Sequence, residues 1–132
     1  MKLKEFQKQL KEQNIDYVIL VSPDPNLTYF TQRSFSHAIS IISGNDVHLF
    51  ITKLDSFPRS TGWRISYLTK DWEKEFSQVK ANTIGINYGS LTIGYLEKFK
   101  RIFPKAVFRD ISKIVADLRA EKTTDEITLI SK

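Results

Sequence analysis

One segment of this 132-residue chain constrains the fold more than any other, because residues 15–21 are almost all apolar. The run reads Ile-Asp-Tyr-Val-Ile-Leu-Val, with apolar side chains on consecutive positions. Side chains of a strand alternate between its two faces, so this strand needs an apolar environment on both. Pro23 and Pro25 follow and end it. The segment therefore predicts a strand in a sheet that helices cover on both sides.

The other β-rich segments predict a mixed sheet. Residues 38–42 and 47–51 are joined by Ser-Gly-Asn-Asp, a sequence typical of a tight turn between antiparallel strands. Shorter strands are predicted at 65–68, 83–87 and 106–108. A sheet that contains a hairpin cannot be purely parallel.

Apolar residues at helical spacing predict the covering helices. The first helix is short and amphipathic, with Leu3, Phe6 and Leu10 on one face, and Asn14 suits its end because asparagine tolerates the left-handed conformation. Four more helical segments are expected: 27–30 capped by Asn26, 72–79, 93–103 capped by Ser90 or Thr92, and 111–118 capped by Asp110.

Length and composition exclude several classes of protein. The chain is long enough for one domain but not for two lobes with a cleft between them. It has no cysteine, which excludes disulfides, thiol nucleophiles and Cys-ligated zinc. Its two histidines, His37 and His48, lie too far apart for a His-His metal pair on one element. With neither a signal peptide nor a membrane-spanning run, we expect a soluble, cytoplasmic protein.

The net charge of +5 raises the question of nucleic acid. Residues 97–113 hold six basic and two acidic side chains and so carry most of the excess. Nucleic-acid binders usually add glycine-flanked aromatics or a helix-turn-helix, and the sequence has neither. We interpret the surplus as a solvated helix face and expect no nucleic-acid partner, with binding through this patch as the weaker alternative.

One loop combines side chains that could recognise a ligand. Residues 30–37 read Phe-Thr-Gln-Arg-Ser-Phe-Ser-His and show no periodicity. Arg33 could hold a carboxylate in bidentate fashion, and His37 could donate to a substrate oxygen near neutral pH. The alternative is an ordinary solvated loop whose aromatic side chain packs into the core. Elsewhere the carboxylates are scattered and no nucleophile or dinucleotide motif occurs, so the chain alone is not expected to be an enzyme.

Three stretches carry a resemblance to a known family. They are Asp-Pro-Asn-Leu-Thr-Tyr-Phe-Thr at 24–31, Thr-Ile-Gly-Ile at 83–86, and Asp-Leu-Arg-Ala-Glu-Lys-Thr-Thr-Asp-Glu-Ile at 117–127. In order and spacing the chain resembles the N-terminal domain of the creatinase/prolidase family of Xaa-Pro peptidases. The resemblance implies an α/β, three-layer, ribonuclease H-like domain, in which a mixed β-sheet is flanked by helices. It places this domain at 1–118 and a linker at 119–132, where Thr123 and Glu126 form a capping box that begins a helix of a missing catalytic domain.

The resemblance also implies a function. The chain would be the non-catalytic N-terminal domain of a metal-dependent Xaa-Pro dipeptidase or aminopeptidase, a homodimer that hydrolyses proline-containing peptides. Two divalent metal ions would lie in the missing catalytic domain, so no residue here is assigned as catalytic or metal-binding. The loop at 32–37 would face the partner subunit, with Arg33 and His37 as candidate substrate-binding residues. Gln32 and Asn87 depart from the family's usual glycine and acidic residue. The alternative is a peptide- or protein-binding module of a homologue without activity.

Overall fold

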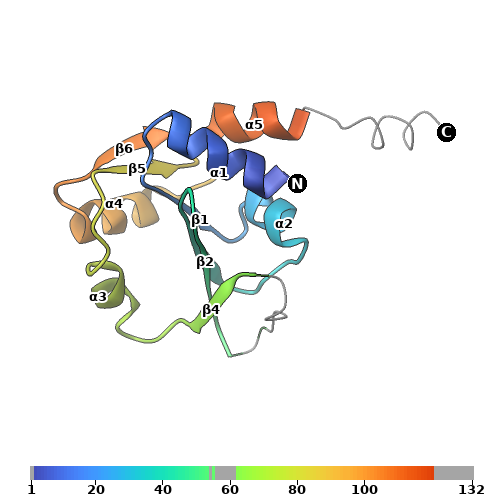
Figure 1. Ribbon diagram of the computed structural model, residues 1–132. Coiled ribbons are helices and arrows are strands. Elements are labelled where there is room, and N and C mark those ends of the chain that lie inside the picture. Colours follow the sequence, from blue (N-terminus) through green and yellow to red (C-terminus); the bar gives the residue numbers. More distant parts are fainter. Residues whose placement is uncertain (1, 54, 56–61, 121–132) are drawn as a thin grey trace.

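The computed structural model describes residues 2–53, 55 and 62–120, and in this part of the chain six strands form one sheet between two layers of helices (Figure 1). This confirms the predicted three-layer α/β fold with a mixed sheet. The elements in chain order are α1 (Lys2–Glu12), β1 (Tyr17–Val21), α2 (Pro25–Thr31), β2 (Ala38–Ile42), β3 (Val47–Ile51), β4 (Arg64–Tyr67), α3 (Trp72–Phe76), β5 (Thr83–Ile86), α4 (Ile93–Ile102), β6 (Val107–Asp110) and α5 (Ser112–Ala120).

The strands follow the order β4-β3-β2-β1-β5-β6 across the sheet. β1, β2 and β3 are antiparallel to one another in succession, as the predicted hairpin requires. β1 pairs in parallel with β5, β5 with β6, and β3 with β4. The carboxyl ends of β1, β5 and β6 therefore lie at the same edge of the sheet, where β2 begins.

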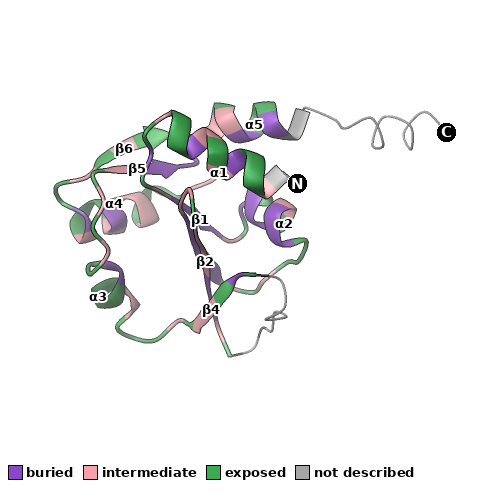
Figure 2. Ribbon diagram, in the orientation of Figure 1, coloured by how far each residue is buried: buried purple, intermediate pink, exposed green. Residues whose placement is uncertain are grey.

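β1 occupies the middle of the sheet, and its sequence explains why. Val18 and Leu20 belong to the apolar cluster on one face, and Ile19 belongs to the cluster on the other. Each of these side chains is at most 1% exposed. The prediction of a strand buried on both faces is confirmed, and Figure 2 shows this central part of the sheet as buried.

Each face of the sheet has its own helical layer. One layer holds α1, α2 and α5, and Phe6 and Leu10 of α1 are fully buried in it. The other holds α3 and α4, which contribute Phe76 and Phe99 to the second cluster. Gly85 of β5 allows the close approach of the chain entering α5, because a Cβ atom there would lie 2.6 Å from Ile111 Cγ2.

Several predicted element boundaries are wrong by a few residues. Asn26 is not the cap of α2, because the helix begins at Pro25 and Asp24 accepts a hydrogen bond from the Asn26 N–H. Proline suits the first helical position, where its missing N–H costs nothing. The helix predicted at 72–79 ends at Phe76, and the strand predicted at 106–108 runs from 107 to 110.

Two predicted helix boundaries are confirmed. Asn14 adopts the left-handed conformation after α1, with φ 57°. Thr92, rather than Ser90, caps α4 by accepting the Tyr95 N–H.

The predicted capping box at Thr123 and Glu126 lies outside the described residues, as does the predicted linker from residue 121 onward. None of the helices in the described part of the chain is long and apolar enough to cross a membrane.

Candidate functional site

Three loops meet where β1 and β5 end and β2 begins. The two strands are parallel neighbours, so the segments that leave them emerge side by side. Residues 22–24 lead from β1 into α2, residues 32–37 lead from α2 into β2, and residues 87–92 lead from β5 into α4. We call these three loops, together with the first turn of α4, the carboxyl edge.

A buried carboxylate and a buried amide join two of these loops. Asp24 and Asn87 are only 3% and 7% exposed, and the Asn87 side-chain amide donates to Asp24 Oδ2 at 3.1 Å. The other Asp24 oxygen caps α2, and Asn87 Oδ1 accepts the Gly89 N–H at 3.2 Å. Each side chain thus holds its own loop and the neighbouring one. The pair fixes the start of α2 relative to the end of β5.

The loop at 32–37 is held at both ends. At its start Gln32 takes the left-handed conformation with φ 58° and turns the chain away from α2. Near its end Ser36 donates to the Asp55 carboxylate through its N–H and through its hydroxyl, the latter at 2.7 Å. These hydrogen bonds, led by that of the Ser36 hydroxyl, lower the pKa of Asp55. Ala38 then enters the sheet as the first residue of β2.

His37 lies against Tyr95 in the first turn of α4. The His37 Nε2 atom and the Tyr95 hydroxyl are 3.1 Å apart, and both side chains are half-buried. This hydrogen bond spans 58 residues of sequence and joins the loop at 32–37 to the segment that follows β5. The candidate imidazole therefore has a defined orientation at the carboxyl edge.

Tyr95 is itself held by aromatic and cationic neighbours. Its ring stacks on Phe99 with centroids 6.0 Å apart and lies 6.5 Å from the Trp72 ring. The Lys98 ammonium lies 5.5 Å from the centroid of the Tyr95 ring and 5.8 Å from that of Trp72. Burial in this cluster raises the pKa of the Tyr95 hydroxyl above the usual value for tyrosine.

Two exposed apolar side chains lie at the start of α4 and in the loop that precedes it. Ile93 at the start of α4 is 76% exposed and Tyr88 is 44% exposed. The Tyr88 N–H donates to Asp110, whose carboxylate also accepts from the N–H and the hydroxyl of Ser112. Partial burial opposes ionisation of Asp110, but the hydrogen bonds outweigh it and lower its pKa. The carboxyl edge thus combines ordered polar groups with exposed apolar surface.

The structure places both predicted site residues, Arg33 and His37, in one loop of the carboxyl edge. Arg33 is exposed, and its N–H donates to the Thr31 hydroxyl at 3.4 Å. Sequence reasoning missed Tyr95. Its contact with His37 could have been predicted only with the strand order in hand, because the loop at 32–37 and the start of α4 meet if β5 pairs with β1. That pairing is a tertiary fact that no local pattern indicated.

The carboxyl edge can donate hydrogen bonds from a guanidinium and an imidazole, which suits a carboxylate or a peptide carbonyl. Among residues 2–53, 55 and 62–120 no group of three or more His, Asp or Glu side chains could hold a metal ion. The described residues of the carboxyl edge therefore present hydrogen-bond donors and no metal-ligand set.

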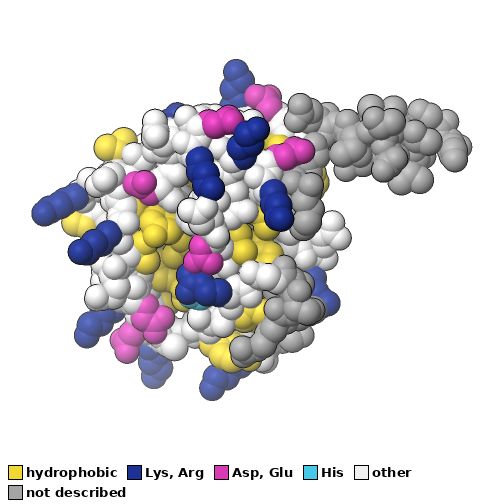
Figure 3. Space-filling view, in the orientation of Figure 1, with side chains coloured by type: hydrophobic (Ala, Val, Ile, Leu, Met, Phe, Trp, Pro, Cys, Tyr) yellow, Lys and Arg dark blue, Asp and Glu magenta, His cyan; other side chains and the backbone are white. Residues whose placement is uncertain are grey.

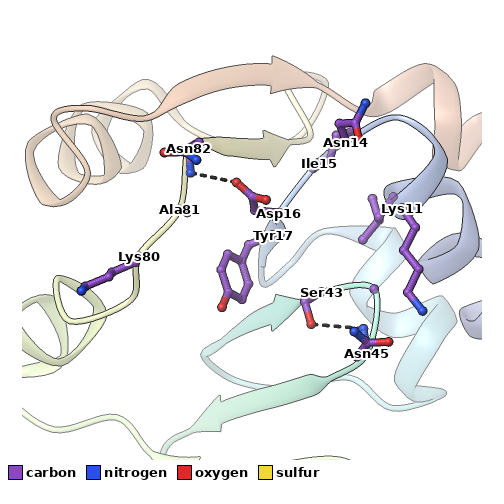
Figure 4. A pocket seen from close by; sticks show the side chains of 12 residues that line it. Lys11, Asn14, Ile15, Asp16, Tyr17, Ser43, Asn45, Lys80, Ala81 and Asn82 are labelled. Carbon is purple, nitrogen blue, oxygen red and sulfur yellow. Dashed lines mark hydrogen bonds between the residues drawn. The ribbon is translucent and has the colours of Figure 1, made fainter.

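A hollow of about 740 Å³ lies at the opposite end of β1 (Figure 4). Tyr17 projects into it, whereas the Lys80 ammonium points away from Tyr17. The Asp16 carboxylate at its rim accepts the N–H groups of Asn82 and Thr83 at 2.8 and 3.0 Å. Asp16 thus joins β1 to the start of β5, which is a structural role.

A second hollow of about 370 Å³ lies on the α3 side of the sheet beside His48. His48 Nε2 is 2.7 Å from the Ser66 hydroxyl, and its ring stacks on Phe50. Burial, followed by the nearby Arg64 guanidinium, lowers the pKa of His48. Arg64 in turn pairs with Asp46 at the surface. His48 faces away from Leu49, as the strand alternation predicts.

The basic surplus predicted at 97–113 spreads over α4, β6 and α5. Within it Arg109 donates to the Gln13 carbonyl at 2.8 Å, and Lys98 covers two aromatic rings. On the face drawn in Figure 3, positive and negative side chains are interspersed around a partly apolar centre. These contacts give structural roles to part of the surplus, and the absence of a nucleic-acid partner stays a prediction.

Comparison with known proteins gives the family. The family model described as the creatinase/prolidase N-terminal domain matches residues 2–120. The chain belongs to this family. The predicted resemblance to this family is thereby confirmed, and the match includes the stretches at 24–31 and 83–86 and the first four residues of the stretch at 117–127. A curated relative, the Xaa-Pro dipeptidase of Pyrococcus furiosus, is 27% identical over 134 residues, which cover 99% of this chain and 38% of the relative.

Solved structures share the fold of this creatinase/prolidase N-terminal domain. The prolidase of Pyrococcus horikoshii has a TM-score of 0.74 at 20% identity, over 96% of this chain and 37% of that one. The creatinase/prolidase N-terminal domain of an Xaa-Pro dipeptidase from Streptococcus pyogenes has a TM-score of 0.69 at 16% identity, over 88% of this chain and 97% of that one. The chain therefore spans less than two fifths of the curated dipeptidase and nearly all of a domain solved separately.

Proposed function

We propose that this domain is the non-catalytic N-terminal part of a metal-dependent Xaa-Pro peptidase, in which it contributes to dimerisation and to gating of substrate access. The observation that supports this most is the match of the family model to residues 2–120, and a curated relative of the chain is an Xaa-Pro dipeptidase. The reaction itself, with its two divalent metal ions, belongs in this proposal to a catalytic domain outside residues 1–132. No step of it is assigned to a residue of this chain.

The gating part of the proposal rests on the carboxyl edge. The loop at 32–37 carries His37 and Arg33, and it is fixed by Asp55 on one side and by Tyr95 on the other. Ile93, two residues before Tyr95 in α4, is exposed and offers one apolar contact for a second copy of the protein. In this arrangement the loop faces the active site of the partner subunit and donates hydrogen bonds to the bound peptide.

The test uses the gene product that contains this chain together with the residues that follow Lys132. We expect metal-dependent hydrolysis of an Xaa-Pro dipeptide, abolished by a chelator and restored by divalent metal. His37→Ala should lower kcat/KM about tenfold or more, the size of one lost hydrogen bond to a charged group. The matched control is His48→Gln, which removes the other imidazole at the opposite end of the sheet and should leave kcat/KM unchanged.

The outcomes distinguish the proposal from its alternative, a peptide- or protein-binding module without activity. If the longer protein binds metal yet leaves proline-containing peptides intact, the peptidase proposal is wrong. If the peptide binds without being cleaved, the alternative is favoured. A monomer in sedimentation at catalytic concentrations would contradict dimerisation.

A further inference from the structure

We propose that Tyr95 is a positioning residue that holds His37 in the tautomer with the proton on Nδ1, so that this N–H is the group His37 offers at the carboxyl edge. The role at a bound peptide rests on the proposed function, whereas the tautomer itself does not. The ligand chemistry that such a group recognises is an anionic or carbonyl oxygen, as in a peptide carboxylate.

The geometry leaves one nitrogen of His37 for a ligand. Nε2 is 3.1 Å from the Tyr95 hydroxyl, a hydrogen-bond distance. In a neutral imidazole one nitrogen donates and the other accepts, so the partner of Nε2 decides which nitrogen carries the proton. If the tyrosine hydroxyl donates to Nε2, the proton must sit on Nδ1.

The surroundings of Tyr95 favour the hydroxyl as the donor. A phenol oxygen shares its lone pair with the ring and is therefore a weak acceptor. The Lys98 ammonium lies 5.5 Å from the centroid of this ring and draws electron density further from the oxygen. A tyrosine hydroxyl is protonated at neutral pH, and burial raises the pKa of Tyr95 further, so the proton is present to be donated.

Both partners of the hydrogen bond are fixed in place. Tyr95 lies in α4, where its ring stacks on Phe99 and also lies 6.5 Å from the Trp72 ring. The backbone of His37 is held on both sides. Ser36 before it donates to Asp55, and Ala38 after it is the first residue of β2 and pairs with Ile51 of β3. The imidazole is thus held between two anchored neighbours, and Tyr95 is the side chain that determines its protonation pattern.

The first experiment measures the tautomer in this chain. Long-range ¹H–¹⁵N correlation spectra at pH 8, where an imidazole is neutral, should show His37 with Nδ1 protonated and Nε2 unprotonated. In Tyr95→Phe, which keeps the ring and its packing, the proton should move to Nε2 or distribute over both nitrogens. Tyr67→Phe is the matched control, because Tyr67 is an exposed tyrosine of β4, and it should leave His37 unchanged.

Two results would overturn this assignment: a wild-type His37 protonated on Nε2, or a Tyr95→Phe variant that keeps the wild-type tautomer. Backbone amide spectra of Tyr95→Phe show whether the fold is retained. If it is not, Lys98→Met provides the second variant, because it removes the cation from the Tyr95 ring and should shift the tautomer partly in the same direction. An unchanged tautomer in a folded Lys98→Met variant would also contradict the proposed cause.

The second experiment measures the consequence in the longer protein. Tyr95→Phe should lower kcat/KM for an Xaa-Pro dipeptide by up to about tenfold, and combining it with His37→Ala should add nothing to the loss caused by His37→Ala alone. An active enzyme that is insensitive to Tyr95→Phe overturns the role at the peptide. A protein without peptidase activity instead overturns the proposed function, and the spectra still decide the tautomer.

Discussion

Asn87→Ala tests the buried pair that joins two loops of the carboxyl edge. The substitution removes the amide that donates to Asp24 Oδ2 at 3.1 Å, in a place where both residues are less than 10% exposed. A hydrogen bond to a charged group contributes about 1.5–3 kcal/mol, and water cannot easily replace it around a carboxylate that is 3% exposed. The Gly89 N–H also loses its acceptor, but it lies in a partly buried turn where solvent can compensate.

We therefore expect Asn87→Ala to lower the free energy of unfolding by about 2–3 kcal/mol. For a domain of this size each kcal/mol lowers Tm by roughly 3–5 °C. Urea unfolding followed by tryptophan fluorescence measures the change, and an unchanged m-value shows that the folded state is intact. The control is Asn82→Ala, an exposed asparagine before β5, expected to change stability by less than about 0.5 kcal/mol. If the two variants are equally stable, Asp24 and Asn87 do not form the link described above.

Two further predictions concern the sheet. Gly85→Ala should lower the free energy of unfolding by about 1–3 kcal/mol, because its Cβ would lie 2.6 Å from Ile111 and 2.9 Å from Val18. The control is Gly94→Ala, where the new Cβ lies in open space within α4, and it should be neutral or slightly stabilising in the same urea assay. His48 should titrate by NMR below its ordinary pKa of 6.5, because burial and then Arg64 disfavour its charged form. The unfolded chain then takes up this proton at higher pH than the native one, so stability should fall as pH drops below about 6.5, and His48→Gln should reduce that fall.

The candidate site could be predicted only in part. Arg33 and His37 were recognisable because a cation and an imidazole occur in a non-periodic segment between two regular elements. Their partners could not be found the same way. Tyr95 lies 58 residues from His37, and Asn87 lies 63 residues from Asp24. Both contacts depend on the parallel pairing of β1 with β5, which the local sequence of neither strand indicates.

What the sequence determined by itself was the position and type of most elements. Consecutive apolar residues at 15–21 required a strand covered on both faces, and helical periodicity around Phe6 required a helix against it. These are local consequences of side-chain spacing and of the free energy of apolar burial. They hold even where a predicted element boundary is wrong by a few residues. In α2, for example, the helix begins at Pro25 and Asp24 is its cap, whereas the sequence predicted Asn26 as the cap.

What only the tertiary structure decided was which ends of these elements meet. Strand order placed the exits of β1 and β5 side by side, and so joined Asp24 to Asn87 and His37 to Tyr95. Hydrogen bonds between side chains require atoms within about 3 Å, and chain segments some 60 residues apart reach that distance only through the packing of the whole sheet. Sequence therefore indicated the imidazole, and the fold supplied the hydroxyl that orients it.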